Sequence, residues 1–165
     1  YYYRYATKIR PNDARMWCAM GQCYEHEHLA MDNEAIRCYR RAVEYNDREG
    51  IALHKLAKLH GKLGHKDAAA HFFSRNLERL EQENNAEGPE AVEALAYLGT
   101  HSKDTGNLAE AEQYFTRLLD FGGPAKEDAK ALLREIRSVL QQQTTAVAAD
   151  PAGMVSPGAM TASPG

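Results

Sequence analysis

Histidine and cysteine are the residues of this chain with the most obvious chemistry, because both bind metal ions. The sequence holds seven histidines and three cysteines. A structural zinc site needs about four convergent ligands. His26 and His28 are two positions apart and would point to different sides of a helix, and His54 and His60 do not share a face well. Since no Cys-x-x-Cys pair occurs either, we expect no metal site and interpret these residues as packing and surface positions.

Catalytic motifs are also missing from the sequence. It contains neither a Gly-x-Ser-x-Gly element nor a phosphate-binding loop. The carboxylates Glu78, Glu81, Glu83 and Glu87 lie in one charge-rich stretch, where we expect them to be solvated. The sequence therefore predicts that the chain is not an enzyme and uses no cofactor.

Composition narrows the possible partners. The 165 residues carry a net charge of -3, so no overall positive field favours nucleic acid. The mean hydropathy of -0.60 and the lack of a long apolar run argue against a membrane partner. Three widely spaced cysteines fit a reducing compartment. The chain starts at Tyr1, within a helical pattern, and we expect it to be the C-terminal portion of a longer protein.

A repeated pattern organises the chain. It begins as Trp17-x-x-Met20-Gly21-x-x-Tyr24, followed by Ala35-x-x-x-Tyr39-x-x-Ala42. It returns as Leu53-x-x-Leu56-Ala57-x-x-His60 with Ala69-x-x-x-Phe73, and again as Leu95-x-x-Leu98-Gly99-x-x-Ser102 with Ala111-x-x-x-Phe115. From Tyr39 to Phe73 is 34 residues, which is the period of the tetratricopeptide repeat. The pattern therefore resembles that repeat family.

The repeat predicts an all-α superhelix built from antiparallel helix pairs. Small residues such as Gly21 let the two helices of a pair approach closely, and each pair leaves an apolar flank for the next. The expected divisions are the second helix of a truncated repeat (1–12), repeat units at 13–48, 49–80 and 91–121, a polar insert (81–90), a capping helix (125–140) and a disordered tail (141–165). The tail is rich in Gln, Thr, Ala, Ser, Pro and Gly, and its Ser156-Pro157 and Ser163-Pro164 pairs match the minimal target of proline-directed kinases.

A peptide-binding groove is the predicted functional site. In tetratricopeptide stacks the first helix of each pair lines the concave surface, and the positions between the framework residues face the groove. These positions are Arg15, Cys18, Gln22 and Glu25 in the first unit, Ile51, His54, Lys58 and Lys62 in the second, and Glu93, Ala96, Thr100 and Lys103 in the third. We expect Trp17 and Tyr24, at framework positions, to be core residues rather than a ligand platform.

Several longer segments resemble one particular family of repeat proteins. They are Tyr1-Tyr2-Tyr3-Arg4-x-Ala6, Arg10-Pro11-Asn12-Asp13 with Arg15-Met16, Gly21-x-Cys23-Tyr24-Glu25, Ala52-Leu53-x-Lys55-Leu56-Ala57-Lys58-Leu59-His60 and Lys130-Ala131-Leu132-Leu133-Arg134. Together they resemble the C-terminal repeats of the subunit-eight family of the anaphase-promoting complex, also called the cell division cycle twenty-three family. The likeness runs over roughly residues 1 to 140.

This resemblance implies a non-catalytic scaffold in a ubiquitin ligase that acts in the nucleus and cytoplasm during cell division. It implies a groove for coactivator peptides, contacts with sister subunits of the complex, and homodimerisation through repeats absent from this sequence. The alternative is a generic adaptor or co-chaperone that binds peptide tails. The carboxylate clamp of such co-chaperones uses Lys and Asn on one helix, then Lys and Arg on the next. Here the matching residues are Cys18, Gln22, Ile51 and Lys55, so the clamp is not supported.

Overall fold

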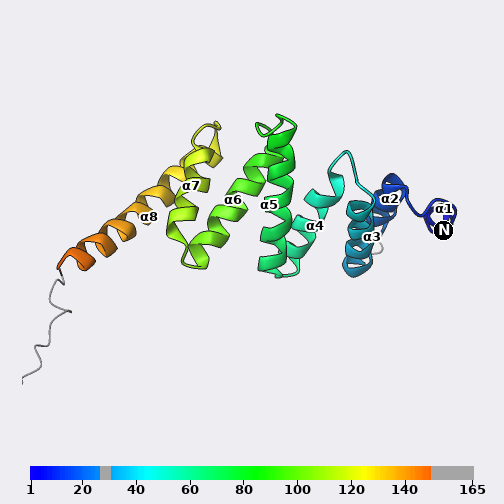
Figure 1. The fold of residues 1–165 in the computed structure, drawn as a ribbon, viewed down its shortest axis with the longest axis horizontal. Coiled ribbons are helices and arrows are strands. Elements are labelled where there is room, and N and C mark those ends of the chain that lie inside the picture. Colours follow the sequence, from blue (N-terminus) through cyan, green and yellow to red (C-terminus); the bar gives the residue numbers. More distant parts are fainter. Residues whose placement is uncertain (27–30, 150–165) are drawn as a thin grey trace, which may run out of the picture.

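The chain folds into an elongated stack of helices. The computed structural model describes residues 1–26 and 31–149, and within these ranges it forms eight α-helices that follow one another along the long axis (Figure 1). Their bounds are α1 (Tyr2–Ile9), α2 (Ala14–Glu25), α3 (Asp32–Glu44), α4 (Ile51–Lys62), α5 (Lys66–Gln82), α6 (Pro89–Asp104), α7 (Leu108–Leu118) and α8 (Pro124–Ala149). Among the described residues, no helix is both long and apolar enough to cross a membrane.

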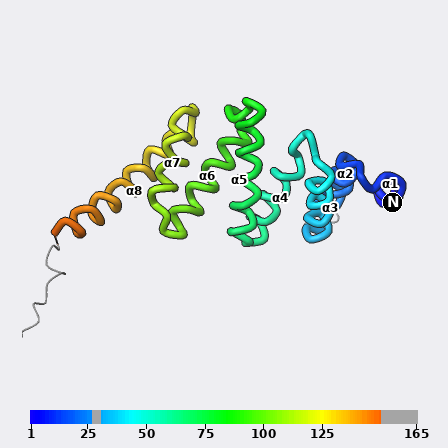
Figure 2. The backbone as a smooth tube through the Cα atoms, in the orientation of Figure 1, coloured from blue at the N-terminus to red at the C-terminus, as the bar shows by residue number. Residues whose placement is uncertain are grey.

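Successive helices pack in pairs. The most extensive contacts join α2 to α3, α4 to α5 and α6 to α7, and further contacts join neighbouring pairs through α3–α4 and α5–α6. The last helix, α8, lies against α7 and touches α6, where it covers the end of the stack (Figure 2). The prediction of an all-α solenoid is confirmed.

The short turns inside two of the pairs depend on glycine. Gly64 joins α4 to α5 with a φ of 79°, and Gly106 joins α6 to α7 with a φ of 84°. An L-residue with a side chain is strained in this left-handed region, whereas glycine enters it freely. The chain can therefore reverse within a few residues and place the two helices side by side.

Close helix contact inside each pair explains the small residues of the repeat. A Cβ atom added to Gly21 would lie 2.8 Å from Cε1 of Tyr39, and one added to Gly99 would lie 2.8 Å from Cζ of Phe115. Real Cβ atoms do not approach so closely, so only glycine lets these rings lie across the neighbouring helix. The middle unit has Ala57 at this position, completely buried. The predicted close approach is confirmed.

The core divides into two buried clusters. The first, which we call the N-terminal cluster, is built around Tyr39, Leu56 and Leu59 on α3 and α4, with Cys18 of α2. The second, the C-terminal cluster, runs from α4 to α8 and includes Phe73, Leu95, Phe115, Leu133 and Ile136. Half-buried Phe72 packs against both clusters, so the apolar interior continues from one to the other.

Trp17 and Tyr24 are half-buried rather than fully enclosed. They pack on the N-terminal cluster, but each keeps one side accessible. Nearer the N-terminus, Tyr1, just before α1, and Tyr2 and Tyr5 on α1 are largely exposed. Trp17 and Tyr24 thus contribute to the core with only part of their surface.

Two element boundaries differ from the prediction. Part of the insert expected at 81–90 is helical, because α5 continues through Gln82 and α6 begins at Pro89. Glu and Gln extend a helix readily, and proline fits its first turn. The ends of the predicted insert therefore belong to α5 and α6, and only residues 83–88 connect the two helices.

The capping helix does not end near residue 140 but continues to Ala149. This extension is exposed, so burial does not explain it. Gln and Ala favour helix, which accounts for the extension. Within it the hydroxyls of Thr144 and Thr145 donate back to the carbonyls of Leu140 and Gln141 at 2.9 and 3.1 Å. The predicted disorder from 141 is wrong for this stretch. The remainder of the predicted tail, with Ser156 and Ser163, lies outside the described residues.

Candidate functional site

The groove candidates of the first unit fall into different environments. Arg15 is exposed, and its Nε donates to Asp13 Oδ1 at 3.4 Å. Gln22 is exposed as well. Asp13 caps α2 by accepting from the backbone N–H of Arg15 at 3.1 Å. Because both side chains are exposed, Arg15 and Gln22 are accessible to another molecule at the surface of α2.

Cys18 does not line the groove, and its assignment there is wrong. It is 5% exposed and belongs to the N-terminal cluster. Burial, together with the nearby carboxylate of Asp47, raises the pKa of the Cys18 thiol to about 12. Burial likewise raises the pKa of Cys38 to about 11, whereas Cys23 is exposed. Ala14 and Gly21, buried on the same side of α2, are the sequence signal that assigns Cys18 to the packed face.

Glu25 holds helices together. Its carboxylate accepts a hydrogen bond from the hydroxyl of Tyr39 on α3 and lies 3.4 Å from Nζ of Lys55 on α4. Tyr39 is completely buried. Burial and the adjacent Glu25 raise the pKa of Tyr39 above its usual value. Glu25 therefore links α2 with the second helix of its own unit and with the first helix of the next.

The candidates of the second unit converge on one carboxylate of the third. Glu93 on α6 lies 3.6 Å from His54 Nε2 and 3.5 Å from Lys58 Nζ, both on α4. The other ring nitrogen of His54, Nδ1, is buried and has no hydrogen-bond partner within the described part of the chain. Lys62 instead pairs with Asp32 of α3 at 3.0 Å.

The third unit continues this arrangement toward the end of the stack. Lys103 on α6 lies 3.1 Å from Glu135 on α8. Thr100 is exposed, and its hydroxyl donates to the carbonyl of Ala96 at 2.9 Å.

The ion pairs Glu25–Lys55, Lys58–Glu93 and Lys103–Glu135, with the contact of His54 to Glu93, form what we call the ion-pair row, which joins α2, α4, α6 and α8. The sequence predicted that these residues lie on the first helices of the units and on the capping helix, but it did not indicate that they pair with one another. Within residues 1–26 and 31–149, Arg15, Gln22 and Thr100 are the exposed polar candidates that have no ionic partner in another repeat.

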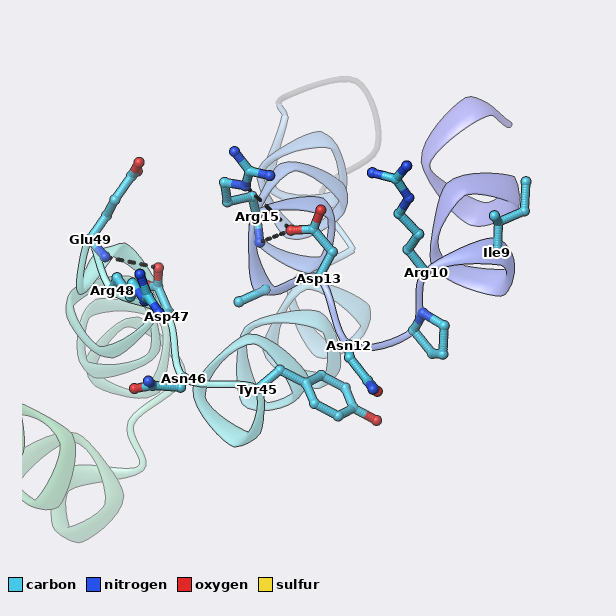
Figure 3. A pocket seen from close by; sticks show the side chains of 12 residues that line it. Ile9, Arg10, Asn12, Asp13, Arg15, Tyr45, Asn46, Asp47, Arg48 and Glu49 are labelled. Atoms are coloured by element: carbon cyan, nitrogen blue, oxygen red, sulfur yellow. Dashed lines mark hydrogen bonds and ion pairs between the residues drawn. The ribbon is translucent and has the colours of Figure 1, made fainter.

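A wide pocket lies at an edge of the stack, between the α1–α2 and α3–α4 connections. It has a volume of about 730 Å³ and is lined by residues 9–15 and 45–49. In Figure 3, Arg10 and Arg15 flank Asp13, and Asp47 accepts from the backbone N–H of Glu49. Its three arginines face three carboxylates, so it has no clear preference for a charged ligand. Asp13 and Asp47, one repeat period apart, are the sequence signal for this repeated junction.

Two of the described histidines, His60 and His65, form a close pair. Nδ1 of His60 lies 3.2 Å from Nδ1 of His65, and the His60 ring stacks on Phe72. Burial, His65 and Arg40 lower the pKa of His60. Within residues 1–26 and 31–149, no group of three or more His, Cys, Asp or Glu side chains could hold a metal ion. The prediction that His26 and His28 point to different sides of a helix cannot be assessed, because His28 lies outside these ranges.

Comparison with known proteins agrees with the geometry. A tetratricopeptide-repeat family model matches residues 14–48, which span α2 and α3. The crystal structure of MamA superimposes with a TM-score of 0.56 at 15% identity, covering 87% of each chain. At this identity the match supports the fold alone.

Three curated relatives match about two thirds of the chain. Anaphase-promoting complex subunit 8 of Arabidopsis thaliana is 56% identical over 111 residues, and the protein of the same name from Dictyostelium discoideum is 46% identical over 105 residues. The Cell division cycle protein 23 homolog of Caenorhabditis elegans is 31% identical over 111 residues. The matches cover 67%, 64% and 67% of this chain but only 19%, 17% and 16% of those relatives.

Proposed function

Because this tetratricopeptide-repeat chain is similar to anaphase-promoting complex subunit 8, we propose that it acts as a non-catalytic scaffold within that ubiquitin ligase. The observation that carries the proposal is the 56% identity to the Arabidopsis thaliana protein over 111 residues. The continuous stack of helix pairs suits the role, since repeat solenoids offer extended surfaces to several partners. In this role the chain would contact other subunits of the complex, in the nucleus and cytoplasm of dividing cells.

The finer proposal concerns the groove. We propose that the exposed face of the first helices binds coactivator peptides, with Arg15, Gln22 and Thr100 as direct contacts. Arginine and amide side chains can hydrogen-bond the backbone of an extended peptide. The ion-pair row is compatible with the groove, because it joins neighbouring first helices, among them α2 and α6, which carry these side chains. Lys58 and Lys103 become available to a peptide only when it competes with Glu93 or Glu135.

Affinity purification of the tagged parent protein from dividing cells, followed by mass spectrometry, tests the scaffold role. Stoichiometric recovery of the cullin-like, RING and repeat subunits of the complex supports it. Recovery of chaperones alone contradicts it and favours the generic adaptor.

The groove is tested separately by peptide capture. An immobilised peptide from the N-terminal box of a coactivator should retain the wild-type chain and lose the Gln22→Ala/Thr100→Ala variant. The Arg134→Ala variant, altered at an exposed position of α8, serves as the matched control and should bind as wild type. Equal retention of all three proteins would overturn the groove assignment and leave the scaffold role intact.

A further inference from the structure

A second cleft lies at the N-terminal end of the stack, among α1, α2 and α3. It has a volume of about 470 Å³ and shares no residue with the groove candidates. Four arginines line it, Arg4 from α1 and Arg37, Arg40 and Arg41 from α3. We call it the arginine cleft. Figure 1 places its three helices at the blue end of the chain.

Positive charge exceeds negative charge in the arginine cleft. Among the described residues that line it, the carboxylates are Glu34 and Glu44, which pair with Arg37 at 3.0 Å and with Arg41 at 3.1 Å. Both pairs are exposed and join neighbouring turns of α3, so each is weak. Arg4 and Arg40 have no acidic partner within ion-pair distance in the described part of the chain. Two guanidinium groups are therefore uncompensated, in contrast to the balanced pocket at the loop edge.

The wall of the cleft is aromatic. Trp17 and Tyr24 line it and are half-buried, so part of each ring faces the cleft. Trp17 also donates from Nε1 to the carbonyl of Pro11 at 2.7 Å, which fixes the orientation of the ring. An aromatic surface beside exposed guanidinium groups can accommodate the apolar stems and backbone of a peptide, while the carboxylates of the peptide meet the arginines.

We propose that the arginine cleft binds an acidic segment of another polypeptide, rich in Asp and Glu. Guanidinium groups bind carboxylates in a bidentate manner, with two parallel hydrogen bonds. Arg4 and Arg40 approach from different helices, so an extended segment with carboxylates at separated positions bridges α1 and α3. This surface would give the scaffold a contact independent of its peptide groove.

Trp17 makes the proposal directly measurable, because it is the single tryptophan of the chain. The full chain is titrated with a synthetic peptide of alternating Glu and Gly, and tryptophan emission is followed. A matched peptide of alternating Gln and Gly serves as the neutral probe. We expect a saturable change of emission with the acidic peptide only, and weaker binding as salt concentration rises.

Charge-reversal variants locate the site. Arg4→Glu and Arg40→Glu should each weaken binding by about tenfold or more, since either change replaces an attraction with a repulsion. Arg40→Lys should retain part of the affinity, because it keeps the charge but loses the bidentate geometry. Arg134→Glu makes the same charge change on α8 and should leave binding unchanged. Arg40 lies on well-packed α3, so its variants test the site even if Arg4→Glu loosens α1.

Three results would overturn the proposal. One is equal loss of binding in Arg134→Glu, which would indicate a diffuse charge effect. Another is equal binding of the neutral peptide. The third is self-association of the chain that depends on Arg4 and Arg40 without any peptide binding, which would make a second copy the occupant.

Discussion

The first and third repeat units use the same close contact with different chemistry. In both, an aromatic ring lies over a glycine of the partner helix, Tyr39 on Gly21 and Phe115 on Gly99. Phe115 sits in the C-terminal cluster with no polar group of its own, whereas the Tyr39 hydroxyl donates to Glu25, which also pairs with Lys55. The backbone packing is thus set by the small residue and the ring. The hydroxyl adds a polar link to the next unit.

The largest expected effect comes from removing either ring. Phe115→Ala and Tyr39→Ala should each lower the free energy of unfolding by about 3–5 kcal/mol, since each leaves a large cavity. Denaturant unfolding followed by helix circular dichroism and by Trp17 emission separates them. Trp17 lies in the first unit, so the unfolding midpoint seen by its emission should fall more in Tyr39→Ala than in Phe115→Ala. Equal shifts of both signals in both variants would show that the stack unfolds as one body.

A smaller effect on stability is expected from adding a methyl group to the glycine that lies under each ring. Gly21→Ala and Gly99→Ala should each cost about 1–3 kcal/mol, because the added methyl group forces the ring to move. The cost should be greater at Gly21, where Glu25 tethers the ring opposite. Thermal unfolding of both variants measures the difference. A greater cost at Gly99 would contradict the tether.

Exchanging the two rings tests the polar link itself. Tyr39→Phe should cost about 1–2 kcal/mol, since Glu25 loses a hydrogen bond. Phe115→Tyr should also destabilise the chain, by a similar amount, because its hydroxyl enters an apolar cluster. Urea titration of the two variants, with the double exchange as a check on additivity, measures these costs. A stabilising Phe115→Tyr would show that the C-terminal cluster offers a polar partner.

The smallest effect is expected in the ion-pair row. Glu93→Gln removes the partner of both His54 and Lys58, yet should change the free energy of unfolding by less than about 1 kcal/mol, because both pairs are partly exposed. The difference between variant and wild type should shrink further in high salt. A salt-independent loss would instead indicate a role for Glu93 inside the core.

The sequence predicted the helix pairs because side chains that touch within a pair occur at fixed spacing and recur in each unit. Gly21, Gly99, Tyr39 and Phe115 are all positions where packing restricts the residue type. The polar interactions between units do not produce a recurring residue type at a fixed position. The convergence of His54 and Lys58 on Glu93 depends on how far one unit rotates against the next.

Other features depend on packing or propensity that a periodic pattern does not report. Cys18 was assigned to the groove by its position in the repeat, while burial beside Ala14 and Gly21 decided its environment. The end of α8 was misjudged because a composition poor in large apolar residues was equated with disorder, although Gln and Ala hold a helix by propensity alone. The arginine cleft combines residues from three helices and has no linear motif.

Of the three thiols in the N-terminal unit, Cys23 is exposed and reactive, whereas Cys18 and Cys38 are protected by burial. Alkylating reagents attack the thiolate, which the raised pKa values of Cys18 and Cys38 make scarce at neutral pH. Exposed Cys23 is therefore the natural attachment point for a single spectroscopic label. The rate at which the other two thiols are labelled then measures how fast this unit opens, without any engineered cysteine.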